Sequence, residues 1–577
     1  MNLQLTHDRT ETLDTDPFAP ADLAPQGVRI DVRELSRRVR VRKRGELTLI
    51  DRASFTITAG QLVAIVGPSG AGKTTLLEAI AGLAPEISGS VHFDGVDVYA
   101  NLGTFRSVLG FVPQDDIIHT DLPLGRTLRY AARLRLPSSS TESEIDAAVR
   151  SALDAVGLTD HADVRVGSLS GGQRKRASIA VELLTDPHVF FLDEPTSGLD
   201  PVTSAELITR LRQLADRSAT VVFTTHSVDD LAHCDRIVFM TRQGRVGFVG
   251  TVEQALAEFA VSSVPELYGR LADPEVTTVS ADVVAPPPPP GPRHVSQRPA
   301  ASGVMQWRVL TRRTLETLTR NRLTLAILIG SPALVIGMFA ILFRPGAFDV
   351  QHPTPSSMVM IGFWVVFAAF FFGLTYGLLQ ICTERTILRR EHLVGLRLGA
   401  YVASKVTVLL PFLLLVIVAM LGVLRLLDRL PSRSLATYAS LGTGLLLCAV
   451  AALGLGLLAS AAVANVAQAT LALPMLCFPA VLFSGAILPV HLMAGAGAAL
   501  SVVIPSRWAF ESVGHDLGAR QILGAGGSPL GPPLLASYGD AGTQSTGTYW
   551  VILAAFAVVF LIGTWAVVVR TTRKSIR

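Results

Sequence analysis

The sequence predicts an α/β domain followed by an all-α domain of six membrane-spanning helices. The first half carries short apolar runs bounded by turn residues, such as residues 62–66 and 189–192, and such runs are typical of buried parallel strands. The second half carries six apolar stretches, each approaching the ~20 residues needed to cross a bilayer. Between the halves, residues 286–290 are consecutive prolines, which favour an extended linker over a helix or a central strand.

The composition excludes several classes of protein. Hydrophobic residues make up 49% of the 577 residues and charged residues 17%, against about 25% charged residues in ordinary soluble proteins. A wholly soluble protein and a mainly disordered chain are both excluded. A net charge of +4 is too small for this length to indicate nucleic-acid binding. The 4 cysteines show no CxxC spacing, so they predict neither a metal site nor a disulfide framework.

Shifts in composition divide the chain into segments. Residues 1–27 are polar, contain three prolines and lack the apolar core of a signal peptide, which predicts a flexible tail. Residues 28–272 form the predicted α/β domain, 273–300 the proline-rich linker and 301–322 an amphipathic, arginine-rich connecting helix. Residues 323–577 form the predicted membrane domain. Its expected spans, of which the third is the shortest, are 323–343, 358–381, 406–424, 441–462, 467–490 and 549–569.

The distribution of basic residues predicts the orientation of these spans. Arginine and lysine gather before the first span, between the second and third, and after the sixth. Such segments are expected in the cytoplasm, which places both termini there and turns the loop 491–548 outward. We therefore expect a multi-pass protein of the inner (plasma) membrane.

Residues 67–74 carry the first chemical motif. They follow a predicted strand, precede a predicted helix and fit the pattern GxxxxGK[ST] of a phosphate-binding P-loop. Glycines let backbone N–H groups turn toward phosphate, and the start of the helix adds its positive dipole end. Lys73 is expected to reach the β- and γ-phosphates of ATP, and the Thr74 hydroxyl to bind Mg²⁺. The predicted ATP-binding residues are Gly67, Pro68, Ser69, Gly70, Ala71, Gly72, Lys73, Thr74 and Thr75.

A second motif follows the apolar strand at residues 189–192. Asp193 is placed to hold Mg²⁺ through water, as a Walker B aspartate does. Glu194 is placed to polarise the attacking water. An acidic pair at a strand end is weak evidence alone, but after a P-loop it predicts a hydrolytic nucleotide site.

Further motifs resemble those of the ABC ATPases. Residues 169–173 read LSGGQ and resemble the ABC signature, and residues 111–114 read FVPQ and resemble the Q-loop. Residues 197–200 (SGLD) and 224–227 (TTHS) resemble the D-loop and the H-loop. All occur in the order of that family, and the resemblance covers essentially all of residues 28–272.

The resemblance implies a role for each matching residue. Gln114 would contact Mg²⁺ or the attacking water, and His226 would contact the γ-phosphate. The signature residues Ser170, Gly171, Gly172 and Gln173 would serve ATP held on another subunit, with Ser170 and Gly172 binding its γ-phosphate. Asp200 would couple the two sites. The implied catalytic set is Glu194, His226 and Gln114, and the implied Mg²⁺ set is Thr74, Gln114 and Asp193.

The sequence departs from the family at the adenine-stacking position. ABC ATPases usually carry an aromatic residue on the first strand, but Phe55 is the only aromatic residue in 28–60 and is too close to the P-loop. Arg37 or Arg38 occupies the approximate place, and an arginine plane can stack on a base. Base contact and nucleotide preference stay open.

The order of the domains resembles the ABCG (White-like) half-transporters and their bacterial relatives. Glu384-Arg385 and Arg390-Glu391 after span two, and residues 483–485 (FSG), also resemble that group. The resemblance implies an ATP hydrolase coupled to export, acting as a homodimer with two composite sites, although a heterodimer stays open. Spans nearly free of ionisable residues disfavour an ion-coupled carrier.

The expected cargo is hydrophobic or amphipathic: a lipid, a glycolipid or a drug-like molecule. Phenylalanines of span two, including Phe363, Phe367 and Phe372, either line an apolar cavity or serve packing and lipid contact. The alternative function is an ATP-controlled regulatory or mechanotransmitting protein. Membrane lipids are expected partners, and nucleic acid is not.

Overall fold

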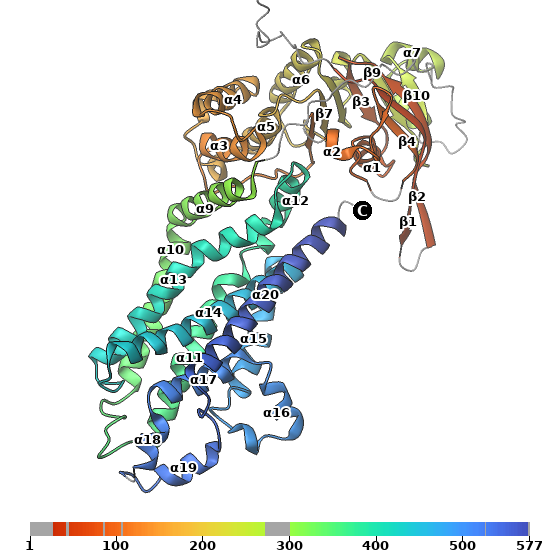
Figure 1. The fold of residues 1–577 in the computed structure, drawn as a ribbon. Coiled ribbons are helices and arrows are strands. Elements are labelled where there is room, and N and C mark those ends of the chain that lie inside the picture. The colour runs from red at the N-terminus through yellow and green to blue at the C-terminus, as the bar shows by residue number, and fades with distance from the viewer. Residues whose placement is uncertain are drawn as a thin grey trace, which may run out of the picture.

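The computed structural model describes residues 27–41, 45–84, 87–105, 108–271, 301–525 and 527–574. The predicted tail, apart from residue 27, and the predicted linker lie outside these residues. The described chain forms an α/β domain and an elongated helical domain that extends away from it (Figure 1). Both predicted fold classes are confirmed.

One sheet of the α/β domain holds six strands in the order β10-β9-β3-β8-β7-β6. The strands are β3 (Leu62–Val66), β6 (Leu109–Val112), β7 (Val189–Leu192), β8 (Thr220–Thr224), β9 (Arg236–Met240) and β10 (Val246–Gly250). Only β10 pairs antiparallel with its neighbour. The predicted strands β3 and β7 are completely buried. Their carboxyl ends therefore meet at one edge of the sheet, where the P-loop and Asp193 follow.

A second, antiparallel sheet has the order β2-β1-β4-β5. Its strands are β1 (Ile30–Val41), β2 (Gly45–Ile57), β4 (Ile87–Phe93) and β5 (Val96–Asp97). The ends of β1 and β2 project beyond the domain (Figure 1). This sheet and part of the first enclose a core that includes Phe55, Phe93 and Phe191.

The helices of this domain begin with local capping signals that are readable in the sequence. Thr141 before α4 and Ser170 before α5 each form a capping box, and Asp200 caps α6, which has proline at its first position. Such caps satisfy backbone N–H groups that lack partners at a helix start. The helices are α1 (Lys73–Ile80), α2 (Leu102–Phe105), α3 (Leu124–Arg135), α4 (Glu142–Ala155), α5 (Gly171–Leu183), α6 (Pro201–Asp216), α7 (Val252–Glu258) and α8 (Val264–Leu271).

The helical domain begins with α9 (Gly303–Arg320), at the position of the predicted connecting helix. The apolar helices are α10 (Arg322–Leu342), α11 (Pro355–Leu378), α13 (Leu398–Leu426), α14 (Leu435–Ala462), α15 (Val466–Leu482) and α20 (Thr546–Lys574). The short α12 (Arg385–Leu393) lies between α11 and α13, on the side of the α/β domain (Figure 1). Within the described residues, five helices are long and apolar enough to cross a membrane, and α15 is shorter.

The lengths of two predicted spans were wrong. The third span was expected to be the shortest, but the helix that contains it, α13, has 29 residues and includes Lys405, which pairs with Glu384 at 2.7 Å. The fifth was expected to reach residue 490, but α15 has 17 residues and ends at Leu482. Gly485 follows with φ +78°, a left-handed conformation that favours glycine and ends regular helix.

The loop predicted at residues 491–548 contains four short helices. They are α16 (Gly495–Ser501), α17 (Pro505–Asp516), α18 (Ala519–Gly524) and α19 (Gly531–Tyr538). α16, α18 and α19 lie at the end of the helical domain farthest from the α/β domain (Figure 1). The loop that was expected to face outward thus lies away from the α/β domain.

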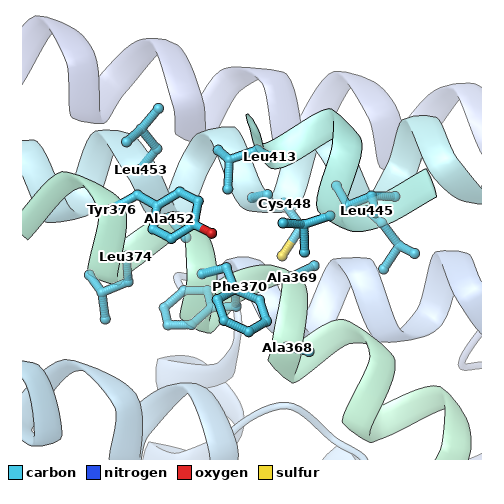
Figure 2. Packing of buried hydrophobic residues seen from close by; sticks show 14 of the residues in the cluster. Ala368, Ala369, Phe370, Leu374, Tyr376, Leu413, Leu445, Cys448, Ala452 and Leu453 are labelled. Atoms are coloured by element: carbon cyan, nitrogen blue, oxygen red, sulfur yellow. The ribbon is translucent and has the colours of Figure 1, made fainter. Parts of the chain in front are cut away.

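Helices α11 and α14 pack closely through glycine. A Cβ atom at Gly373 would lie 2.1 Å from the Ala449 carbonyl oxygen, and one at Gly456 would lie 2.3 Å from that of Leu374. Small residues at such contacts let membrane helices approach closely. Figure 2 shows Phe370 and Leu374 of α11 beside Cys448 and Leu453 of α14 in this core.

Candidate functional site

The P-loop has the backbone shape that its glycines predict. Gly70 and Gly72 have φ +80° and +90°, in the region that side chains disfavour. A Cβ at Gly72 would lie 2.5 Å from the Leu49 carbonyl oxygen, and one at Gly67 2.5 Å from that of Met240. Pro68, Ser69 and Ala71 complete the loop, and Thr75 lies in the first turn of α1. The loop therefore accepts only glycine at its tightest points.

Lys73 is the first residue of α1 and turns back over the P-loop. Its Nζ donates to the carbonyl oxygens of Gly67 at 3.0 Å and Pro68 at 3.3 Å. Burial lowers the pKa of Lys73, while Glu194 and Asp193 oppose that shift. The ammonium group lies at the mouth of a loop lined by backbone, where it can meet an anionic group.

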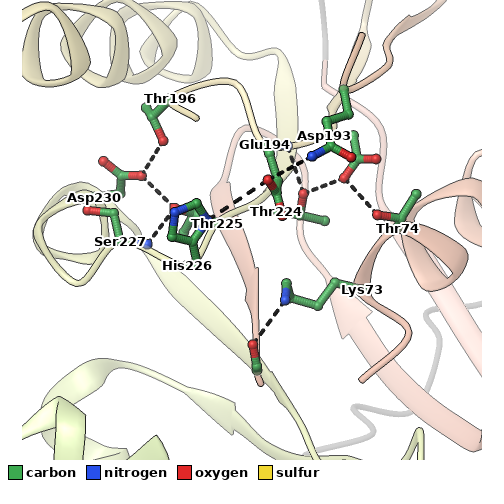
Figure 3. A network of polar contacts seen from close by, with 12 residues as sticks. Lys73, Thr74, Asp193, Glu194, Thr196, Thr224, Thr225, His226, Ser227 and Asp230 are labelled. Atoms are coloured by element: carbon green, nitrogen blue, oxygen red, sulfur yellow. Dashed lines mark hydrogen bonds and ion pairs between the residues drawn. The ribbon is translucent and has the colours of Figure 1, made fainter. Parts of the chain in front are cut away.

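Asp193 is the buried acid at the end of β7. Its Oδ1 accepts hydrogen bonds from the Thr74 hydroxyl at 3.1 Å and the Thr224 hydroxyl at 2.6 Å (Figure 3). Two of the three residues expected to hold Mg²⁺, Thr74 and Asp193, are thus adjacent. Their oxygen atoms are of the kind that Mg²⁺ prefers, so this pair fits the ion.

Glu194 is positioned by its backbone and by two side chains. Its φ is +46°, and its N–H donates to the Thr224 hydroxyl at 2.8 Å. The amide Nε2 of Gln114 donates to Glu194 Oε2 at 3.1 Å, and His226 Nδ1 lies 3.9 Å from the same oxygen. The structure therefore unites the three residues implied as catalytic around one carboxylate. Within the described residues, Gln114 forms a hydrogen bond with Glu194 and none with Thr74 or Asp193.

The sequence did not predict a polar network that lies behind His226. Asp230 Oδ2 accepts hydrogen bonds from the hydroxyls of Thr196 at 2.7 Å and Thr225 at 2.6 Å (Figure 3). The Thr225 hydroxyl in turn accepts from the Ser227 N–H at 3.0 Å. This buried network fixes the turn that carries His226. The only sequence signal is the acidic pair Asp229-Asp230, which begins two residues after the H-loop motif ends, and acidic residues after a strand are common.

The signature residues form the start of α5. The Ser170 side chain accepts from the Gln173 N–H, and Gln173 Oε1 accepts from the Ser170 N–H at 3.0 Å. Gly171 and Gly172 are the first helical residues. In the described part of the chain, no hydrogen bond joins residues 170–173 to the P-loop. Ser170 and Gly171 are exposed and therefore accessible to another subunit.

Asp200 caps α6 with both carboxylate oxygens. It accepts from the Thr203 N–H at 3.0 Å and the Thr203 hydroxyl at 2.6 Å. These bonds lower the pKa of Asp200, and the ionised form suits a helix start.

The structure separates the two arginines considered for base contact. Arg37 is mostly buried, and its Nη1 lies 3.5 Å from Glu78 Oε2 in α1. Arg38 is exposed on β1, opposite Thr48 of β2. Phe55 is completely buried and cannot stack on a base. Of the two guanidinium groups, that of Arg38 is therefore the more accessible for stacking on a base.

Helix α12 is joined to the α/β domain through one buried arginine. Arg390 donates from Nε to Glu182 Oε1 at 2.6 Å and from Nη2 to the Ser178 carbonyl oxygen at 2.9 Å. Glu182 also forms a bidentate pair with Arg135 of α3, at 2.7 and 2.8 Å. Burial opposes ionisation, but Arg135 and Arg390 outweigh it and lower the pKa of Glu182 to about 2. Removing one partner of such a buried pair is strongly destabilising.

A second buried pair joins α12 to the connecting helix. Arg313 of α9 forms a bidentate ion pair with Glu391, the residue after Arg390. Glu316 of α9 accepts a hydrogen bond from the Tyr130 hydroxyl of α3 at 2.6 Å. Both α9 and α12 are therefore held against the α/β domain by polar contacts.

An apolar cavity of about 490 Å³, open to the surface, lies between α10 and α11, and its lining includes the exposed side chains of Met338, Ile341 and Leu342. Trp364, Phe367 and Phe371 line it as a ladder of ring contacts. Phe363 and Phe370 are buried in packing instead. Phe372 is buried and also lines the cavity, so the cavity-lining and the packing phenylalanines of span two overlap.

Comparisons with known proteins agree with this division of the chain. The family described as ABC transporter matches residues 50–197, and the family described as ABC-2 type transporter matches residues 305–514.

Individual relatives match parts of the chain. The ABC transporter ATP-binding/permease protein Rv1747 of Mycobacterium tuberculosis is 36% identical over 63% of this chain and 43% of its own length. ABC transporter G family member 14 of Arabidopsis thaliana is 35% identical over 38% of this chain and 34% of its own. The Nod factor export ATP-binding protein I of Sinorhizobium fredii is 34% identical over 39% of this chain and 65% of its own. The matched regions thus span less than two thirds of each relative.

The matches to two families in this order account for both domains. The ABC transporter match contains the P-loop, the signature and Asp193, and the ABC-2 type match contains α12 and the first apolar helices. The chain thus matches the ABC transporter family over most of its α/β domain and the ABC-2 type transporter family over much of its multi-pass helical domain, in the domain order of the ABCG half-transporters.

Proposed function

We propose that this protein is an ATP-driven exporter that works as a dimer of half-transporters. It moves a hydrophobic or amphipathic molecule, such as a lipid, a glycolipid or a drug-like compound, out of the cytoplasm or the inner leaflet. The observation that carries the proposal is the contact of Arg390 with Glu182 and Ser178. Through it, a loop of the membrane domain is bonded directly to the helix that begins with the ABC signature.

The residues of the site suit hydrolysis of the terminal phosphate of ATP. Lys73 and the P-loop backbone bind the phosphates, and Glu194 orients and polarises the attacking water. Gln114 and His226 keep the Glu194 carboxylate aligned with the terminal phosphate. Thr74 and Asp193 would hold Mg²⁺, which, when bound, neutralises charge on the β- and γ-phosphates.

The exposed signature supports a composite site between two copies. Residues 170–173 of one subunit serve the P-loop of the other, and Asp200 lies at the junction. Both motifs are intact on this chain, so a homodimer contains two complete sites. Closure of the ATPase pair is transmitted through α12 to the membrane helices.

The membrane domain supports a lipid-like cargo. The cavity between α10 and α11 is lined by apolar side chains, and α15 exposes Leu471, Met475 and Phe478 on one face. A relative is named for the export of Nod factor, which supports transport outward. Basic residues of α9, α12 and the end of α20 support a cytoplasmic ATPase domain and cytoplasmic termini in the inner membrane.

ATPase activity of the purified protein in lipid nanodiscs tests the proposal. Wild type is expected to hydrolyse ATP, and Glu194→Gln to lose roughly 100-fold or more, as expected for a general base. Glu258→Gln, on the exposed surface of α7, is the matched control and retains activity. A fraction of native lipid extract is expected to raise the rate and to be moved across vesicle membranes. Hydrolysis without any vectorial movement would favour the regulatory alternative.

A further inference from the structure

Lys175 is a buried cation that the proposed mechanism does not use. It is the fifth residue of α5, and only 5% of its surface is exposed. Its Nζ donates to the carbonyl oxygen of Gln114 at 2.5 Å and lies 3.5 Å from that of Pro113. Burial lowers the pKa of Lys175, and Asp116 and Asp193 oppose the shift. An ammonium group placed on a backbone carbonyl makes one of the stronger hydrogen bonds in proteins.

The same loop is held from a second direction. Arg390 of α12 donates from Nη1 to the carbonyl oxygen of Ile117, three residues after Gln114. Arg390 also contacts Ser178 and Glu182. Lys175, Ser178 and Glu182 are spaced to lie on one face of α5. One helix face and one arginine therefore hold both ends of residues 114–117.

The other end of Gln114 reaches the catalytic acid. Its side-chain amide donates to Glu194 Oε2 at 3.1 Å, while its main-chain carbonyl accepts from Lys175. A displacement of this main chain would carry the amide away from Glu194. The position of the carboxylate relative to the attacking water then depends on Lys175.

We propose that Lys175 is a positioning residue for ATP hydrolysis, which fixes the Gln114 main chain so that the Gln114 amide holds Glu194 in its working orientation. This inference rests on the proposed ATPase function. Because Lys175 and the contacts of Arg390 share one face of α5, docking of α12 and orientation of Glu194 are coupled through the same helix. A lysine that only fills the core would stabilise the fold without acting through Gln114.

Kinetics of three variants separate these roles. Lys175→Met keeps all but the last atom of the side-chain length and removes the donor, so kcat is expected to fall roughly 10- to 100-fold, the loss associated with misplaced catalytic groups. KM for ATP is expected to stay within a factor of about two, since Lys73 and the P-loop are unchanged. Lys175→Arg is expected to retain most of the activity. The matched control is Arg176→Met, which removes a neighbouring cation that donates to the Val156 carbonyl oxygen at 3.2 Å instead.

A double-mutant cycle tests whether Lys175 acts through Gln114. If it does, Lys175→Met combined with Gln114→Ala is no slower than Gln114→Ala alone. Losses that multiply, or a fall in thermal stability that accounts for the whole effect, would overturn the inference.

Amide hydrogen exchange without nucleotide supplies a readout that does not need turnover. Amides of residues 114–118 are expected to exchange several-fold faster in Lys175→Met than in wild type and in Arg176→Met. Unchanged amide exchange in this segment would show that Lys175 does not fix the main chain of the Q-loop. A wild-type protein that binds ATP but does not hydrolyse it would instead contradict the proposed function, so the two failures are distinguishable.

Discussion

Thr224 shows how a single residue can organise the site without belonging to any catalytic set. Its hydroxyl donates to Asp193 Oδ1 and accepts from the Glu194 N–H. It is completely buried at the end of β8. One hydroxyl therefore ties the Mg²⁺ candidate and the water-polarising candidate to the neighbouring strand.

Thr224→Val is predicted to damage both stability and rate. Valine has the same shape but leaves the Glu194 N–H unpaired, which lowers the free energy of unfolding by about 1–3 kcal/mol. kcat is expected to fall roughly tenfold or more, because the orientation of both acids relaxes. Thermal unfolding and ATPase assays check the two effects. Thr224→Ser, which keeps the hydroxyl, should restore both, and a Ser variant as poor as Val would contradict this explanation.

Among the elements, α12 determines how the two domains meet. Its buried Arg390 contacts Glu182 of the α/β domain, and its buried Glu391 pairs with Arg313 of α9. Substituting the buried Arg390 is destabilising, because loss of its charge would leave several partners unpaired. The same pairing fixes one geometry in which α12 docks on the α/β domain. The helix is therefore suited to transmit a rigid-body movement of the ATPase domain.

Arg390→Met is predicted to uncouple the two domains. Methionine fills the space but bonds neither Glu182 nor the Ile117 carbonyl, so stimulation of ATPase activity by cargo-containing lipid should fall several-fold, while nucleotide binding persists. Arg389→Met is the matched control, since Arg389 makes none of these contacts in the described chain. The comparison requires lipid-stimulated ATPase rates and nucleotide titrations of both variants. Equal stimulation in the two variants would contradict a role of Arg390 in transmission.

At the scale of the whole molecule, a single chain presents its P-loop and its signature as separate surfaces. Lys73 and Glu194 gather at the carboxyl edge of the six-stranded sheet, whereas Ser170 and Gly171 are exposed at the start of α5. Two half-sites on one chain support the proposed dimer, in which each nucleotide would lie between subunits.

Complementation between two inactive variants is predicted to reveal such composite sites. Lys73→Ala removes the phosphate-binding cation, and Ser170→Arg places a bulky side chain on the signature surface. Each variant alone should be inactive, but a mixed dimer keeps one intact pair: the P-loop of the Ser170→Arg subunit and the signature of the Lys73→Ala subunit. Co-expression with two affinity tags and ATPase assays of doubly tagged protein test this. Inactive mixed dimers would argue that each site needs only one chain.

The sequence by itself determined the fold classes, the order of the domains and most of the nucleotide site. Phosphate binding needs glycines at fixed spacing between a strand and a helix, and a membrane helix needs a long apolar run, so both features are written in contiguous residues. The positions of Lys73, Asp193 and Glu194 followed from such local patterns. The lengths of α13 and α15 did not, because α13 includes a charged residue, Lys405, that is paired with Glu384, and α15 ends before the turn at Gly485.

The tertiary structure alone decided which side chains meet. Thr224 joins Asp193 across 31 positions, Lys175 joins Gln114 across 61, and Arg390 joins Glu182 across 208. A lone threonine, lysine or arginine in a helix or strand carries no periodic signal for such a partner. Burial gives these contacts their strength, since an unpaired polar group in a low-dielectric interior is costly. Which residues are buried together is known only once the chain has folded.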